Sequence, residues 1–415
     1  MALQNKSDSI ALLSLFSSSI KFLVGPLTLV IVSTLLTTEE IGFYYTFLSI
    51  VAAQEMMEFG LGNVIRQHYA HSKNQRDISR YYTFSLIYYS LTSILFLIIG
   101  QIIGLIVFDS YQGNIQWLIP WTITVSAAAI KNLTLPVSAY LDGVQQQEKL
   151  QVANIYSSIF SSIVLWLALW FGFGLYSLSL YMISFAIFFM FQTASNVVNK
   201  NLIHFSINEI KSTFSELWVL LRRTAIVWMI GYLFWNGFNL ISFSLKGAEF
   251  AGVIGFSIAL ARAGVNISNS MFLNQTTLIS KMISDGYIAE SVKILKKYLL
   301  ICSVFLIFGF LIFTQLKISF PTLPIINKTI DVTDLVVMFS YFTILSVMII
   351  INTYVRCFKI EPFVGLSIFN GIFVPASYAI SLNLELYKFA LPCIAISVSL
   401  AISYAILKNT LRRWT

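Results

Sequence analysis

Long apolar stretches separated by short polar or charged breaks make up almost the whole chain. About 20 mainly apolar residues are enough for a helix to cross the hydrocarbon core of a bilayer. Twelve stretches reach that length, so the pattern predicts twelve membrane-spanning helices. Their expected ranges are 10–36, 41–65, 81–108, 116–141, 150–172, 175–198, 218–246, 249–280, 298–320, 333–357, 362–383 and 387–407. The shortest breaks, 172–175 and 246–249, predict tight helical hairpins.

The composition leads to the same class of protein and excludes a soluble domain. The chain has 415 residues, of which 57% are hydrophobic and only 11% are charged. A soluble domain carries about 25% charged residues, so we expect an all-α polytopic membrane protein. The sequence contains neither a P-loop for ATP nor a segment outside the expected spans that is long enough for a catalytic domain. Both observations favour a transporter over an enzyme.

The net charge of +8 is distributed unevenly between the two sides of the expected membrane. With twelve spans both termini lie on one side, and that side receives nineteen of the 26 Lys and Arg residues. Cytoplasmic loops of membrane proteins carry an excess of Lys and Arg, so we expect both termini in the cytoplasm. Basic loops of this kind also attract anionic membrane lipids. Because the charges are spread over separate short loops, they do not indicate binding of nucleic acid.

The expected spans fall into two sets of six, separated by a polar segment at residues 199–217. Apolar and charged residues alternate in this linker, as is typical of an amphipathic segment on a membrane surface. We therefore expect an N-terminal six-helix lobe at 1–198, a cytoplasmic linker at 199–217 and a C-terminal six-helix lobe at 218–415.

A short sequence echo supports the two halves. The second expected span opens with Glu39-Glu40-Ile41-Gly42, and the eighth opens with Glu249-Phe250-Ala251-Gly252. Six spans separate the two motifs, so both segments enter the membrane from the same side. The repeat would then be parallel, with its pseudo-twofold axis along the membrane normal.

Three cations stand alone near the middle of expected spans: Lys21, Lys131 and Arg262. A charge at the centre of a bilayer costs about 2.5–3.5 kcal/mol on insertion scales and is usually kept for a function. Two of the cations come from the first half and one from the second, so together they predict a cavity that accepts an anion. The rigid fork of the Arg262 guanidinium suits phosphate better than a point charge does.

Two carboxylates, Glu55 and Glu58, lie at a similar depth in the second expected span. Their i, i+3 spacing places both on one face of a helix. Buried charges generally pair, so one interpretation is an internal salt-bridge network with Lys21 or Lys131. The other is proton coupling, since transporters use buried carboxylates as proton relays. The sequence leaves both open.

Other candidate chemistry is sparse. The three cysteines have no spacing typical of metal ligands and are interpreted as packing residues, so we assign no metal and no cofactor. Four aromatic residues are candidates for stacking on sugar rings, although such residues also form interface belts. They are Tyr44, Tyr45, Trp228 and Trp235.

Two motifs resemble a known family. The run from Thr37 to Ile50, TTEEIGFYYTFLSI, is similar to the start of the second span in O-antigen flippases of the Wzx type. The continuation Glu58-Phe59-Gly60-Leu61-Gly62, followed by a basic loop from Arg66, fits the same pattern. The similarity extends to the counterpart in the eighth span and to the twelve-span layout. The chain thus resembles polysaccharide transporters of the multidrug/oligosaccharidyl-lipid/polysaccharide exporter superfamily.

The resemblance implies two six-helix lobes around a central V-shaped cavity, the fold of multidrug and toxin extruders and of lipid II flippases. It also implies a substrate, an oligosaccharide linked to undecaprenyl pyrophosphate, which moves from the inner to the outer leaflet of the bacterial inner membrane. Such proteins take part in O-antigen and lipopolysaccharide biosynthesis, with a polysaccharide polymerase and a chain-length regulator as expected partners. Family members line the cavity with cations, a role that Lys21, Lys131 and Arg262 match by position and depth.

Two other functions remain open at the level of sequence. A multidrug exporter of the same fold would favour cationic drugs and hence an acidic cavity, whereas the midspan charges here sum to +1. A membrane-embedded glycan polymerase would need long outer loops, and the longest expected outer loop covers only residues 321–332. Both comparisons favour the flippase.

Overall fold

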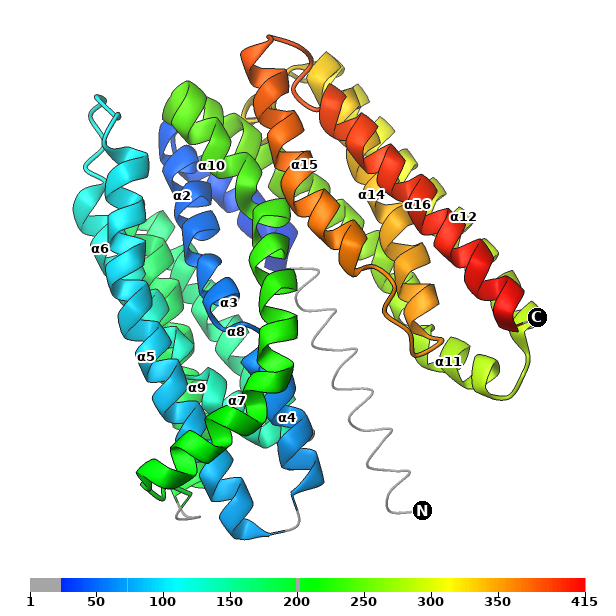
Figure 1. Ribbon diagram of the computed structural model, residues 1–415. Helices are drawn as coiled ribbons and strands as arrows, with labels where there is room; N and C mark the ends of the chain where they lie inside the picture. Colours follow the sequence, from blue (N-terminus) through cyan, green and yellow to red (C-terminus); the bar gives the residue numbers. More distant parts are fainter. Residues whose placement is uncertain (1–23, 73, 199–201, 415) are drawn as a thin grey trace. The chain divides into compact units, whose positions relative to one another are not determined.

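The computed structural model describes residues 24–72, 74–198 and 202–414. In this part of the chain every regular element is a helix (Figure 1). A first helix covers Val24–Leu35. It is followed by α2 (Thr38–Val51), α3 (Ala53–Met57), α4 (Leu61–His71), α5 (Gln75–Phe108), α6 (Leu118–Asn132), α7 (Leu135–Gly143), α8 (Gln147–Trp170), α9 (Tyr176–Val198), α10 (Ile207–Leu273), α11 (Thr276–Ser284), α12 (Ile288–Ser319), α13 (Pro324–Asn327), α14 (Val332–Arg356), α15 (Val364–Asn383) and α16 (Ala390–Trp414).

Nine helical segments of the described residues are long and apolar enough to cross a membrane, which confirms the all-α membrane class. One of them, Trp228–Ser284, has 57 residues and takes in most of two separately predicted spans. Within it Gly247 has φ 86° and ψ −178°, a conformation open essentially to glycine alone. The helix is therefore broken within 246–249, where the sequence predicted a hairpin. The first expected span is described only from Val24 onward, so the count of twelve stays a prediction.

The second expected span, 41–65, is not one helix. It consists of α2, α3 and the first part of α4, with an interruption at Phe59 and Gly60. These two residues have φ of 53° and 78°, the left-handed region that ends a right-handed helix. The expectation of one continuous helix was wrong here, because a left-handed Phe59 cannot be read from residue type.

The described chain divides into two compact units. Unit 1 contains the residues up to Tyr232 together with Phe243–Gly252, and unit 2 contains Leu233–Ser242 together with the residues from Val253 onward. The predicted lobe boundary at 199–217 remains a prediction. The beginning of α10, up to Tyr232, packs in unit 1.

Unit 1 combines a lipid-type exterior with an interior rich in aromatic and small polar residues. On α5 the apolar side chains of Leu91, Ile94 and Ile98 are more than half exposed, as suits a helix face in contact with lipid. Inside, Tyr69, Tyr82 and Tyr140 pack together in one buried cluster. Burial against lipid-like surroundings gains little, so close packing and hydrogen bonds must hold these helices together.

Unit 2 follows the same principle. Phe238, Tyr341, Tyr378 and Phe389 form a buried aromatic cluster with ring centroids 5.0–5.9 Å apart. The Tyr378 hydroxyl lies 2.7 Å from that of Ser242, so the two share a buried hydrogen bond. This cluster links the segment 233–242 of α10 to α14 and α15.

Two glycines mark a close crossing of α2 and α10 inside unit 1. A Cβ atom placed on Gly42 would lie 2.0 Å from the carbonyl oxygen of Ala248, and one on Gly252 would lie 2.0 Å from that of Thr38. The contact is reciprocal, because Thr38 and Ala248 are separated by the same number of residues as Gly42 and Gly252. Reciprocity of this kind is what a twofold axis produces. The crossing therefore agrees with the predicted pseudo-repeat at the echo motifs, while the repeat as a whole stays a prediction.

Candidate substrate-binding site

Lys131 lies where the fourth expected span is interrupted. It belongs to the last turn of α6, and Leu133 and Thr134 separate α6 from α7. Pro136 in the first turn of α7 has no N–H to donate, so one backbone hydrogen bond across the break is lost. A cation at the C-terminal end of a helix is favoured by the helix dipole. Broken helices at membrane depth are typical of binding sites in transporters.

The ammonium group of Lys131 faces two aromatic rings of α9. Its Nζ atom lies 5.5 Å from the ring centroid of Tyr181 and 5.0 Å from that of Phe185. Both distances are within the range of cation–π attraction. Such rings stabilise the cationic form of Lys131 without neutralising it.

Glu55 contributes negative charge in this part of unit 1. Its charge interacts with those of Lys131 and Glu58. Among the described residues, however, no ion pair within 4.0 Å joins either carboxylate to a lysine or arginine. The interpretation as a direct salt bridge between Lys131 and Glu55 or Glu58 is therefore not supported in this conformation.

The Glu58 carboxylate accepts hydrogen bonds from other groups of unit 1 instead. Its Oε1 atom accepts hydrogen bonds from the backbone N–H of Gly62, at 2.7 Å, and from the hydroxyl of Tyr89, at 2.6 Å. These bonds satisfy a free N–H in the first turn of α4, just after the left-handed residues. The carboxylate therefore stabilises the break in the second span. A role of Glu55 or Glu58 in proton coupling stays a prediction.

Arg262 lines a pocket in unit 2. The pocket has a volume of about 190 Å³. Its lining residues are Trp235, Arg262, Val265, Asn266, Phe342, Leu345 and Ile349. Arg262 and Asn266 are one helical turn apart and supply the polar part of a lining that is otherwise apolar. The arrangement is a small cationic pocket with an amide beside it.

The guanidinium of Arg262 is held in place but not satisfied. Its Nη2 group donates a hydrogen bond to the carbonyl oxygen of Trp235, and its central carbon lies 5.4 Å from the Trp235 ring centroid. Its Nε–H is buried and has no acceptor among the described residues. A buried donor without an acceptor costs about 1–3 kcal/mol, so an incoming oxyanion would relieve a cost already present.

The structure brings the predicted residues together only in part. Lys131 and Glu55 lie in unit 1 and interact electrostatically, Arg262 lines the pocket of unit 2, and Lys21 lies outside the described residues. Sequence reasoning missed Asn266, although its i+4 spacing from Arg262 was a usable signal. It also missed Tyr181 and Phe185, which are far from Lys131 in sequence and carried no signal. Among the aromatic candidates, Trp235 contributes to the pocket.

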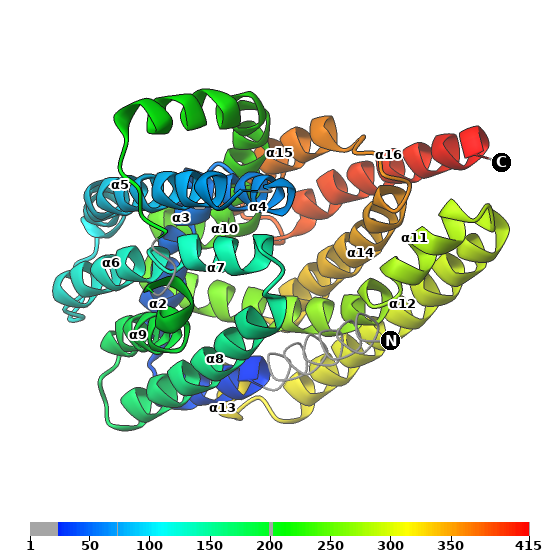
Figure 2. The same cartoon turned by 90° about the horizontal axis from the view of Figure 1, so that it is seen from below.

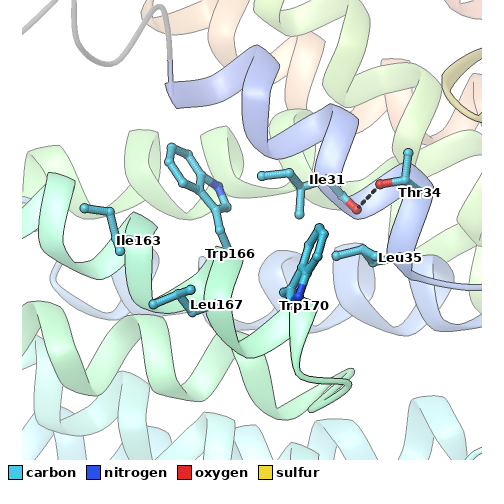
Figure 3. Close-up of a pocket in the computed structure, with 7 residues that line it drawn as sticks. All are labelled: Ile31, Thr34, Leu35, Ile163, Trp166, Leu167 and Trp170. Atoms are coloured by element: carbon cyan, nitrogen blue, oxygen red, sulfur yellow. Dashed lines mark hydrogen bonds between the residues drawn. The ribbon is translucent and has the colours of Figure 1, made fainter.

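A second pocket lies on unit 1 between the helix Val24–Leu35 and α8 (Figure 3). Its volume is about 270 Å³. The rings of Trp166 and Trp170 face Ile31 and Leu35 across it. Two of its polar side-chain groups already form hydrogen bonds. The Thr34 hydroxyl donates to the Ile31 carbonyl at 3.0 Å, and the indole N–H of Trp166 donates to the Thr28 hydroxyl at 3.0 Å.

This second pocket therefore offers mainly apolar surface. Trp170 is 75% exposed and Leu167 is 50% exposed, so the pocket opens to the outside of unit 1 rather than being sealed in its core. We call it the lateral pocket. Its chemistry suits a hydrocarbon chain and not a charged head group.

Comparison with known proteins gives a family match over part of the chain and a fold over nearly all of it. The sequence model of a family described as polysaccharide biosynthesis protein matches residues 31–234. None of the curated proteins compared matches the chain.

Among solved structures, an inward-facing multidrug resistance MATE transporter of the MOP superfamily has a TM-score of 0.73 at 11% identity, covering 97% of this chain and 99% of that one. The lipid II flippase MurJ in an inward closed conformation has a TM-score of 0.68 at 10% identity, covering 97% and 87%.

A third similar structure is a MOP superfamily transporter from Pyrococcus furiosus, described as having a binding pocket of reversed polarity. Its TM-score is 0.61 at 12% identity, covering 98% of this chain and 94% of that one. The chain therefore has the fold of the MOP superfamily transporters over nearly its whole length. The family match over residues 31–234 agrees with the resemblance that the sequence showed.

Proposed function

We propose that this protein is a flippase for lipid-linked oligosaccharides. Its substrate would be an O-antigen or related repeat unit on undecaprenyl pyrophosphate, moved from the cytoplasmic to the outer leaflet of the bacterial inner membrane. The observation that carries the proposal is the Arg262 pocket: a buried guanidinium with a free donor, in a chain with a transporter fold and a polysaccharide-biosynthesis match.

The chemistry of the head group fits this pocket. A pyrophosphate must cross about 30 Å of hydrocarbon, and fixed donors have to replace the water that it loses. Arg262 offers its Nε–H and remaining guanidinium donors, and Lys131 offers an ammonium that pairs with no carboxylate within 4.0 Å in the described part of the chain. We assign head-group binding to Arg262, Lys131 and Lys21, and sugar contact to Trp235 and Asn266.

The lipid tail needs a different environment from the head group. The lateral pocket is apolar and open to the outside of unit 1, so a segment of the isoprenoid chain could remain there while the head group occupies the polar site. Transport would follow alternating access, by rocking of the two halves. Both termini would lie in the cytoplasm, as the distribution of Lys and Arg indicates.

The test is a gene deletion in the native host, with two assays on the same cells. One measures surface polysaccharide, and the other measures lipid-linked oligosaccharide on the cytoplasmic leaflet. We expect loss of the first, accumulation of the second, and restoration of both by the wild-type gene. Normal polysaccharide together with new drug sensitivity would make the protein a multidrug exporter instead.

The same strain tests the role of Arg262. Hydrogen bonds to charged groups contribute about 1.5–3 kcal/mol, so Arg262→Ala should lower the rate of transport by roughly ten- to a hundredfold. Arg262→Lys keeps the positive charge and loses only the planar, forked arrangement of guanidinium donors, so its effect should be smaller. Wild-type transport by the Ala variant, at equal protein level in the membrane, would remove Arg262 from head-group binding.

A further inference from the structure

The beginning of α10 presents a row of exposed aromatic, aliphatic and basic side chains that the transport site does not use. We call this row the outward stripe. It consists of Ile207, Lys211, Phe214, Trp218 and Arg222, which recur every three or four positions and so lie on one side of the helix. Ile207, Phe214 and Trp218 are 64%, 45% and 46% exposed. An exposed apolar row of this length requires a partner.

The sides of the helix next to the outward stripe carry other kinds of side chain. On one of them Ile210, Thr213, Leu217 and Leu221 pack into the core of unit 1. Figure 1 and Figure 2 show this part of α10 running obliquely along the ends of α4 and α5. The helix therefore rests on the bundle through one side and leaves the outward stripe uncovered.

Two ion pairs fix the rotation of the helix about its own axis. Arg76 of α5 binds Glu209 with an N–O distance of 2.7 Å, and Arg80 binds Glu216 at 3.0 Å. The Tyr81 hydroxyl also donates to Glu216 at 2.7 Å. With its acidic side tied to α5 in this way, the helix cannot turn the outward stripe inward.

A third side of the helix is polar. Asn208, Ser212 and Ser215 are all exposed, and they flank the outward stripe on the side away from the core. The helix thus packs against protein with one side, carries apolar and basic side chains on the next side, and carries only polar side chains on the third. That sequence of sides suits a helix at the edge of a bundle, where protein, lipid and water meet.

We propose that the outward stripe is a membrane contact that binds anionic phospholipid. Its aromatic residues suit the level of the lipid head groups, and Lys211 and Arg222 within the same row complement a negative surface. The stripe is also continuous with lipid-embedded structure, since the same helix continues into the membrane-spanning segment that contains Trp228–Ser284. The contact therefore anchors the segment that joins the two halves of the chain. It does not depend on which substrate is transported.

The experiment uses the full-length chain with its three cysteines replaced, checked against wild type by thermal unfolding in detergent. A nitroxide label is attached to a single cysteine at Phe214 or Trp218 on the stripe, or at Ser212 on the polar side as the matched control. Each protein is reconstituted in vesicles of phosphatidylcholine alone or with phosphatidylglycerol. Accessibility to oxygen and to a water-soluble nickel complex then reports the depth of each label.

We expect labels at 214 and 218 to be more accessible to oxygen, and the label at 212 to be more accessible to the nickel complex. Phosphatidylglycerol should shift the stripe labels deeper, and Lys211→Gln with Arg222→Gln should abolish that shift. Equal nickel accessibility at all three positions would overturn the proposal. Labels shielded from both reagents would also overturn it, because a protein would then cover the stripe. Oxygen accessibility without a response to phosphatidylglycerol would refute the binding of anionic lipid.

Discussion

Glu58 shows how a charge near the middle of an expected span can serve the backbone. Its carboxylate accepts from Gly62 N–H and from the Tyr89 hydroxyl, directly after the left-handed residues Phe59 and Gly60. A helix start inside a bilayer has no water to satisfy its free N–H groups. Glu58 supplies that acceptor, so its first role is structural, and any part in transport would act through the shape of the break.

Replacing Glu58 with Ala should therefore destabilise the protein. We expect the free energy of unfolding to fall by roughly 1–3 kcal/mol, because two buried donors lose their acceptor. Glu58→Gln should cost less, since the amide oxygen still accepts. Unfolding followed by circular dichroism in detergent measures both, with Glu55→Ala as the control because Glu55 is exposed. Equal stability of the Glu58→Ala and Glu55→Ala variants would contradict the structural role.

At this scale the sequence predicted which residues carry unusual charge, but not what surrounds them. Arg262 stood out because an isolated cation in an apolar span is costly. Its contacts with Trp235 could not be predicted, since that carbonyl lies 27 positions away in the sequence and is brought to the guanidinium only by the way α10 packs. The aromatic partners of Lys131 depend likewise on how α6 and α9 pack.

At the scale of elements, apolar length predicted most helices and missed the breaks inside expected spans. The ranges expected at 150–172, 333–357 and 362–383 correspond to α8, α14 and α15. The interruption of the second span was not predicted, because Gly60 alone is a weak signal and Phe59 gives none. The break within α10 was predicted, because charged residues and a glycine coincide at 246–249.

The attachment of α10 to α5 should depend on pH. The hydrogen bond from the Arg76 guanidinium lowers the pKa of Glu209 below its ordinary value of 4.5. A carboxyl group with a lowered folded-state pKa contributes stability above its unfolded-state pKa and loses it as the pH falls through the folded-state value. Glu209→Gln should therefore unfold at a lower temperature than wild type near pH 7, and the difference should shrink below about pH 4.5. A difference that is independent of pH would rule out this ion pair as its cause.

The crossing of α2 and α10 should tolerate no side chain. Gly42→Ala or Gly252→Ala would place a methyl group 2.0 Å from a backbone oxygen, and overpacking of this kind typically costs 1–3 kcal/mol. Gly309→Ala is the matched control, since nothing lies within 4 Å of its Cβ position, and alanine is the better helix former by about 1 kcal/mol. We expect the first two variants to lose stability and transport and the third to keep both. Full stability of Gly42→Ala would mean that the helices separate easily.

At the scale of the whole molecule, the sequence predicted a class that the fold comparisons confirm, since length, apolar content and span number are additive properties of the chain. How the two units are arranged during transport is a property of contacts between distant segments, and no local pattern encodes it. The orientation of the units in the membrane can be predicted from the sequence only in part. It depends on loop charges, which the sequence does reveal, and on the parallel repeat, which the echo motifs only indicate.

Labelling of single cysteines can decide that orientation. A parallel repeat places the α4–α5 and α11–α12 connections on the same side, whereas an inverted repeat would place them on opposite sides. In a cysteine-free background we expect Asn74→Cys and Asp285→Cys to resist an impermeant maleimide on intact cells and to react once the cells are opened. Asn114→Cys and Glu385→Cys, in loops with little basic charge, should react on intact cells. All four positions are exposed on the protein, so a failure to react reports the membrane and not burial. Reaction of Asp285→Cys alone on intact cells would mean that the second half has the inverted orientation. It would also contradict the proposal of rocking about a parallel twofold axis.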